Sequence, residues 1–200
     1  MSSGQTTVPA PYIVAPTDSW DGDDGMWSTF AIEAGTPPQS FRVLPSTVGE
    51  EIWLPATQGC VGQLAGLPNC GDLRGVNDFY GVASLGFQSN ESSTWNYIDL
   101  ETLDTQQNLF DDSAVYGQDT VALGTGPANS GYGTAIPKQV IAGVTTEDFW
   151  LGNLGLGIFA HTKTMPSLLV SMKAQNLTTS LSYGYTAGQY YSKSITNSIH

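Results

Sequence analysis

Alternating and β-branched apolar positions predict a chain built mainly of short strands. Five segments carry this pattern, and they are residues 12–14, 27–33, 41–44, 52–54 and 134–144. One further segment, residues 166–176, has helical spacing instead, with Leu168, Leu169 and Met172 on one face. A proline in its first turn and an asparagine at its end suit the two ends of a helix. The pattern favours an all-β fold with one or two short helices.

A turn at residues 35–39 and a loop at residues 46–49 separate the first strands. Pro37 and Pro38 fix φ in the turn and remove backbone donors there. Small residues form the loop, and Pro55 ends the strand that follows it. A strand, a tight loop and a second strand can place a short loop in a cleft, so this loop is the first candidate site.

The turn sequence Gly-Thr-Pro-Pro-Gln at residues 35–39 is followed by a strand, a small-residue loop and an apolar strand with Trp53 and Pro55. This order resembles the N-terminal lobe of pepsin-like aspartic proteases. Residues 87–95 and 153–159 resemble later segments of that lobe. In the second of these segments, alternating Gly and Leu would let two backbones approach closely while apolar side chains fill the core.

The resemblance covers roughly residues 27–185 and implies how the chain is divided. We expect residues 1–25 to form an N-terminal extension or first strand. We expect residues 26–190 to form a single pepsin-like lobe with an acid-protease β-barrel, and residues 191–200 a C-terminal tail. A length of 200 residues suits one domain with its own core, whereas a complete enzyme of the family has two such lobes.

The catalytic positions of the family do not match this chain. Ser46, Thr47 and Val48 stand where the family has Asp-Thr-Gly. In aspartic proteases two carboxylates share a proton, and losing one positioned general base lowers the rate on the order of 10² to 10⁴. A hydroxyl does not titrate at neutral or acid pH, and a β-branched residue is expected to crowd a spot where the family's backbone passes tightly. These residues therefore predict a catalytically inactive domain.

The family also carries a β-hairpin flap, with a Tyr, that closes over bound peptide. It is usually followed by a strand ending in Gly-x-Asp-Thr-Val, which residues 117–121 match. The flap's usual Tyr-Gly-x-Gly run is absent, and no strand–turn–strand of adequate length is evident before Tyr116. We therefore expect a short or missing flap, and we assign Tyr116 to the later motif.

Other side chains give further candidates for chemistry. Glu50 and Glu51 follow the loop and one should point outward, although solvation of both is the simpler interpretation. Ser46 as a nucleophile would need a base, and His161 is expected to face away from the cleft. Residues 21–25 have the composition of a calcium loop but lack the later Glu, so a solvated hairpin turn is the simpler interpretation. We expect no metal and no cofactor.

Charge and cysteine usage narrow the classes of partner and compartment. The net charge of −12, with only six Lys+Arg, argues against nucleic acid and anionic membranes as partners. Cys60 and Cys70 would be free thiols in a cytosolic protein. In an oxidising compartment a disulfide between them would close a short loop and stabilise the folded state by about 2.8 kcal/mol. The resemblance also implies a disulfide at this place.

Two tripeptides at Asn90 and Asn176 match the N-glycosylation acceptor pattern, and with the cysteines they favour secretion. No leader pattern or membrane-spanning run is evident, so we expect the signal peptide and any anchor to lie outside this chain. We expect a secreted or extracellular cell-surface pseudo-aspartic protease domain that binds a protein or peptide. The alternative is an aspartic-type endopeptidase whose second lobe is absent from this chain or which uses a non-standard catalytic residue. A lone lobe exposes an edge, so pairing with a second lobe or self-association is also expected.

Overall fold

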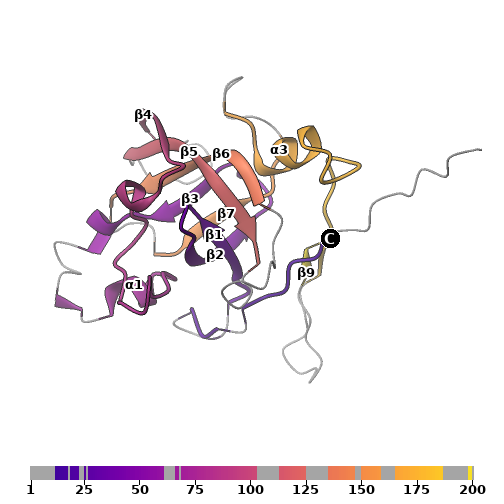
Figure 1. The fold of residues 1–200 in the computed structure, drawn as a ribbon. Coiled ribbons are helices and arrows are strands. Elements are labelled where there is room, and N and C mark those ends of the chain that lie inside the picture. The colour runs from indigo at the N-terminus through magenta and orange to yellow at the C-terminus, as the bar shows by residue number, and fades with distance from the viewer. Residues whose placement is uncertain are drawn as a thin grey trace, which may run out of the picture.

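The computed structural model is built mainly of strands (Figure 1). It describes residues 12–17, 19–22, 25, 27–60, 66–67, 69–102, 113–124, 135–146, 150–158, 165–186 and 198–199. The strands are β1 Phe30–Ala34, β2 Gln39–Ser46, β3 Ile52–Pro55, β4 Asn96–Thr102, β5 Ser113–Leu123, β6 Ala135–Val144, β7 Gly152–Gly155, β8 Tyr185–Thr186 and β9 Ser198–Ile199. The helical elements are η1 Thr57–Cys60, α1 Cys70–Leu73, η3 Ser89–Glu91 and α3 Leu168–Ala174.

Six of the strands close into a barrel. The main sheet runs in the order β1-β2-β7-β3-β6-β5-β4. Residues 32–34 of β1 also pair with residues 121–123 of β5, which joins the two sides of the sheet. β4 pairs with the other half of β5 and lies outside the closed ring. The predicted all-β, barrel-like fold is confirmed.

The alternating pattern of the first strands determines which side chains face the barrel interior. On β1, Phe30, Ile32 and Ala34 are buried and the residues between them are half-buried. β2 repeats the pattern, with Phe41 and Val43 buried. Because successive side chains of a strand point to opposite faces, these residues share the inner face and form part of the main core cluster.

Helix α3 packs against the same core. Leu168, Leu169 and Met172 are all buried in the main cluster, as their helical spacing predicts. The helix is shorter than the predicted segment at both ends, because it begins after Ser167 and its last turn ends at Gln175.

Strand β7 lies between β2 and β3, although β2 and β3 follow one another along the chain (Figure 1). It runs parallel to β2, with Gly155 opposite Ser46, and antiparallel to β3, with Leu154 opposite Ile52. The loop of residues 46–51, which joins β2 to β3, must therefore cross over the end of β7.

Three backbone hydrogen bonds tie this loop to the end of β7. They run from Gly155 N to Glu51 O at 3.0 Å, from Leu156 N to Ser46 O at 2.9 Å and from Gly157 N to Gly49 O at 2.9 Å. A Cβ on Gly155 would lie 2.5 Å from backbone atoms of Glu50 and Glu51, so this position has no room for a side chain. The predicted role of the alternating glycines, close approach of two backbones, is confirmed.

The turn at residues 35–39 is held by a distant segment of the chain. The side-chain amide of Gln39 donates to Gln88 O at 3.0 Å and accepts from Gln88 N–H at 2.8 Å. Thr36 N–H donates to the Ser92 hydroxyl at 2.9 Å. Trp95, a few residues on, packs on the main core cluster, as expected for an anchor of this segment. The turn is thus part of the frame of the barrel.

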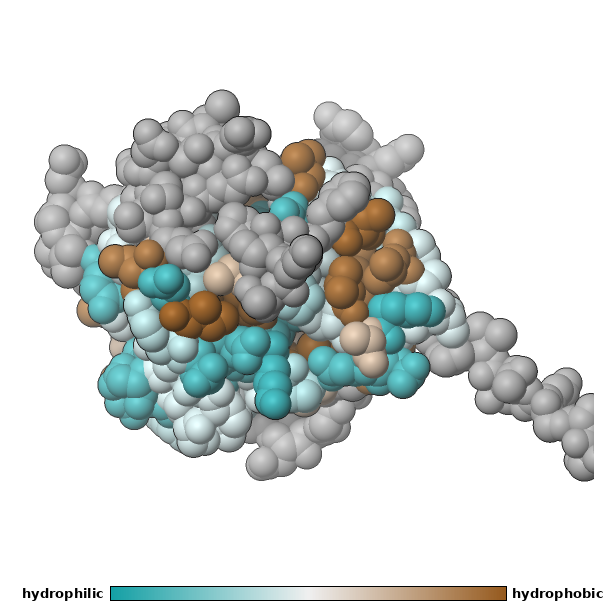
Figure 2. Space-filling view, turned by 90° about the horizontal axis from the view of Figure 1, so that it is seen from above, coloured by the Kyte–Doolittle hydropathy of each residue, from teal (hydrophilic) through white to brown (hydrophobic). Residues whose placement is uncertain are grey.

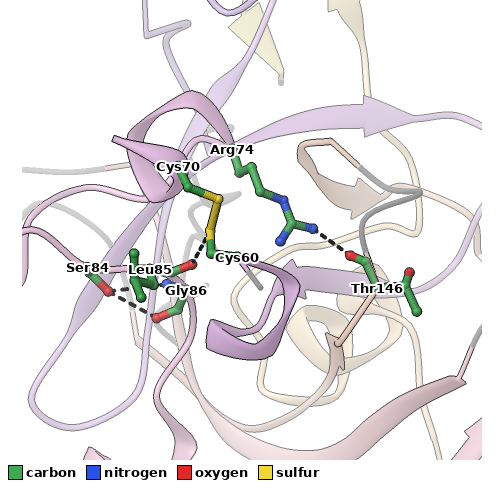
Figure 3. The surroundings of a disulfide bond; sticks show 7 residues. All are labelled: Cys60, Cys70, Arg74, Ser84, Leu85, Gly86 and Thr146. Atoms are coloured by element: carbon green, nitrogen blue, oxygen red, sulfur yellow. Dashed lines mark hydrogen bonds between the residues drawn. A yellow bond between two sulfur atoms is a disulfide. The ribbon is translucent and has the colours of Figure 1, made fainter. Parts of the chain in front are cut away.

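Cys60 and Cys70 form a disulfide that joins the end of η1 to the start of α1 (Figure 3). The prediction of this bridge is confirmed. Arg74 lies beside it and is fully buried, and its guanidinium donates to Thr146 O at 2.9 Å. A Cβ on Gly59 would lie 2.0 Å from the guanidinium, so η1 packs directly on this charged group.

The expectation that no adequate strand pair precedes Tyr116 is wrong. β4 and β5 form an antiparallel pair that runs from Asn96 opposite Gln118 to Thr102 opposite Ser113, with a bulge near Ile98. None of the described side chains of β4, at residues 96–100, is buried, so they show no alternation of buried and exposed positions. A strand without a buried face carries no periodic signal, which is why the sequence pattern missed it. Residues 103–112 between the strands lie outside the described residues.

Replacing Gly155 with alanine tests the close contact between loop and strand. Gly155→Ala is expected to lower the free energy of unfolding by about 1–3 kcal/mol, because its Cβ would overlap the backbone of the loop. Gly25→Ala is the control, since an added Cβ there meets nothing within 4 Å. The free energy of unfolding of this control is expected to stay within about 0.5 kcal/mol of that of the natural chain. Equal denaturation midpoints for the two variants would contradict the contact.

Candidate functional site

The candidate site is the loop of residues 46–51. Ser46 is the last residue of β2 and is half-buried, whereas Thr47 and Val48 are exposed. The side chain of Val48 is 70% exposed. The expected crowding by Val48 is therefore wrong, because most of this side chain lies in solvent.

The Ser46 hydroxyl is used inside the loop. Its oxygen accepts a hydrogen bond from Gly49 N–H at 2.9 Å. Serine hydroxyls commonly satisfy a nearby backbone donor in this way and so stabilise a turn. The geometry gives Ser46 a structural role, and a hydroxyl at this place offers no carboxylate to hold or activate water.

Glu51, at the end of the loop, is an acid with a defined side-chain partner. The Tyr116 hydroxyl lies 3.1 Å from each of its two carboxylate oxygens and donates to them. Tyr116 comes from β5 and is almost fully buried in the second core cluster. The backbone oxygen of Glu51 also accepts from the Asn153 side-chain amide at 3.1 Å. These contacts hold the start of β3 to both β5 and β7.

The expectation that both glutamates are solvated is wrong for Glu51. Both residues are half-buried and line one small cavity. The sequence carried no sign of the Glu51–Tyr116 contact, because 65 positions separate the two residues. Only the pairing of β5 with its neighbours brings the tyrosine to the loop. His161 lies outside the described residues.

The possible calcium loop at residues 21–25 is organised by an ion pair. Asp21 is buried, and its carboxylate accepts from Arg42 Nε at 2.9 Å and from the Thr29 hydroxyl at 2.7 Å. Gly22 N–H donates to Gly25 O at 3.1 Å. The expectation of full solvation is wrong for Asp21, because the arginine side chain satisfies its charge. Among the described residues, no three His, Cys, Asp or Glu side chains are grouped so as to hold a metal.

Two further acids lie on the barrel strands. Asp119, in the Gly-x-Asp-Thr-Val segment, is buried and accepts from Thr94 at 2.5 Å and from Thr120 N–H at 2.8 Å. It therefore links β5 to the segment that holds the turn of residues 35–39. On β1, burial raises the pKa of the Glu33 carboxyl. Because burial makes ionisation of Glu33 harder in the folded state than in the unfolded state, the protein loses stability as the pH rises from the ordinary pKa of a glutamate through this raised pKa.

Both predicted glycosylation acceptors are accessible. Asn90 is exposed, and its amide donates to Glu91 at 2.9 Å. Asn176 is exposed just after α3, with a positive φ of 58°. Neither acceptor needs the fold to open before a glycan could be accommodated.

The surface mixes apolar and polar residues. Figure 2 shows hydrophobic residues beside hydrophilic ones on the face seen from above. On β4, Tyr97 and Leu100 are 57% and 59% exposed.

No helix within the described part of the chain is both long and apolar enough to cross a membrane.

Comparison with known proteins adds no assignment. No model of a protein family matches the chain, and no curated protein matches it.

The role of the Ser46 hydroxyl can be measured as stability. Ser46→Ala is expected to lower the free energy of unfolding by about 0.5–1.5 kcal/mol, because Gly49 N–H loses its acceptor. Thr47→Ala, at the exposed neighbouring position, is the control and is expected to change it by less than about 0.5 kcal/mol. Urea unfolding of both variants checks this. A Ser46→Ala protein as stable as the control would refute the structural role.

Proposed function

We propose that this chain is a catalytically inactive, pepsin-like β-lobe of a secreted or cell-surface protein, and that it acts as a binding module. The family relation is inferred from the order of sequence segments. Its support is the placement of those segments: the turn at residues 35–39 leads into β2, the small-residue loop follows, and the Gly-Leu segment forms β7 between β2 and β3.

The observation that carries the proposal is the state of Ser46. Its hydroxyl satisfies Gly49 N–H within the loop, at the position where a protease of this family needs a carboxylate. The frame of the loop depends on backbone hydrogen bonds to β7, so the side chain of residue 46 can change without loss of the frame. Loss of catalysis with retention of the fold is the expected outcome.

The outer edge of β4 is the surface that we propose for partner binding. β4 pairs with β5 on one side, and among the described residues no strand pairs with its other side. An unpaired strand edge can accept an extended segment through main-chain hydrogen bonds. The net charge of −12 opposes a second copy of this chain and favours a segment with basic residues. An extended basic peptide or a second lobe is therefore the partner class that this edge fits best.

A proteolysis assay tests the absence of catalysis. The full chain, incubated with an unfolded protein at the acid pH where paired carboxylates share a proton, is expected to give no pepstatin-sensitive cleavage. Ser46→Ala should give the same blank result. Cleavage that disappears in Ser46→Ala would contradict the proposal.

The endopeptidase alternative has one observation in its favour, the Glu51 carboxylate held beside the loop by Tyr116. In the same assay, pepstatin-sensitive cleavage that persists in Ser46→Ala and is lost in Glu51→Gln would support this alternative. A blank result for all three proteins would contradict the endopeptidase alternative.

Secretion is tested through the two acceptor asparagines. Expressed through a eukaryotic secretory pathway, the protein is expected to carry N-glycans at both sites, because both side chains are exposed. Removal of glycans with an endoglycosidase should increase electrophoretic mobility in two steps, and Asn90→Gln and Asn176→Gln should each remove one step. An unmodified protein recovered from the medium would contradict the glycosylation prediction.

A further inference from the structure

The outer edge of β4 carries an acid at its centre. β4 lies at the periphery of the barrel (Figure 1), pairs with β5 on one side, and has no strand on its other side among the described residues. Asp99 is exposed in the middle of this strand, opposite Tyr116 of β5. Tyr97 and Leu100, which precede and follow Asp99 in the sequence, are exposed as well. An approaching strand therefore meets a carboxylate between two apolar side chains.

The Asp99 carboxylate is engaged with the backbone of its own strand. It accepts a hydrogen bond from Leu100 N–H at 2.8 Å, and both residues are exposed. A hydrogen bond of the β4–β5 ladder lies between the two strands, whereas this one lies at the surface. Charged side chains on an edge strand are one means by which proteins prevent pairing with unrelated strands. Asp99 thus satisfies a backbone donor at the surface of β4 and adds a charge to the edge.

The charge of Asp99 determines which strand can pair beside it. Within the part of the chain that the structure describes, no Lys or Arg forms an ion pair with Asp99. Like charges directly opposite each other on paired strands are destabilising, whereas opposite charges stabilise the pair. A second copy of this chain, paired through its own β4, would bring a second Asp99 to the interface. A strand with a Lys or Arg at this place would bring the missing cation.

We propose that Asp99 sets the specificity of the β4 edge: it admits an extended segment of another protein that places a Lys or Arg opposite it, and it excludes a second copy of this chain. This inference rests on the binding role proposed above for the edge. When the segment docks, its cation pairs with the Asp99 carboxylate, and Leu100 N–H passes to a main-chain carbonyl of the segment. The net charge of −12 attracts such a basic segment from a distance.

A series of matched peptides tests the role of Asp99. The full chain is titrated at low ionic strength against a fluorescent peptide of alternating Thr and Val with a central Lys, and binding is followed by anisotropy. This peptide is expected to bind about two- to fivefold more tightly than its central-Ala version, the range typical of one exposed ion pair. A central-Glu version should bind more weakly than either. Asp99→Asn should abolish the preference for Lys over Ala. Asp78→Asn, which neutralises an exposed acid outside the strands, is the control and should keep it.

The same series separates this inference from the wider proposal. An unchanged Lys preference in Asp99→Asn would overturn the role of Asp99, because the preference would then come from the acidity of the whole chain, and the edge would remain the binding surface. A Lys peptide with N-methylated main-chain amides cannot donate to a strand and should not bind detectably. If it binds as tightly as its parent, or if no peptide binds, the β4 edge itself is overturned as the binding surface, and this inference with it.

Sedimentation velocity tests the exclusion of a second copy without any partner. The natural chain is expected to sediment as a monomer. Asp99→Val removes the acid and adds a β-branched residue to the edge, so this variant should self-associate as its concentration rises. Asp78→Val is the matched control and should remain monomeric, and circular dichroism checks that both variants keep the fold. Equal behaviour of the natural chain and Asp99→Val, whether both are monomeric or both associate, would overturn the exclusion.

Discussion

The backbone hydrogen bonds between the loop of residues 46–51 and the end of β7 are the constraint on which the candidate site depends. They require that β7 pass between β2 and β3, and they require glycine at Gly155, where a Cβ would overlap the loop. Because main-chain atoms make these bonds, the shape of the loop is nearly independent of its side chains. This explains how a loop can keep its frame while the residue at its start is a serine.

The two arginines of the chain serve a related structural purpose. Only six Lys+Arg are present, and both arginines are directed inward. Arg42 pairs with Asp21 and also donates to Asn77 at 2.6 Å, so it holds the N-terminal segment to the barrel. Arg74 is fully buried beside the disulfide. Asp21 and Asp119 are buried as well, so these internal charges offset one another and the outer surface keeps the acidic excess of the composition.

Local patterns predicted the parts of the fold that local physics determines. The alternation at Phe30, Ile32 and Ala34, the helical spacing in α3, and the Cys60–Cys70 disulfide all appear in the structure. The glycine spacing in β7 was predicted together with its reason, the close approach of two backbones. Each of these signals is contained within a short segment, and a short segment can be interpreted without knowledge of its neighbours.

The contacts that were missed depend on distant segments or on exposed ones. Tyr116 reaches Glu51 across 65 positions, and Arg42 reaches Asp21 across 21. None of the described side chains of β4 is buried, so its pairing with β5 left no hydrophobic period to detect. The position of Val48 was misjudged for a similar reason, because exposure at a loop tip depends on how the loop crosses β7. Within the candidate site, residue types were therefore predictable and their partners were not.

A high-resolution crystal structure of the chain at acid pH tests the central claim most directly, at the loop of residues 46–51. We expect the Ser46 hydroxyl to accept from Gly49 N–H, and Thr47 and Val48 to remain in solvent. An acidic side chain at the tip of the loop, holding an ordered water against a second carboxylate, would contradict it.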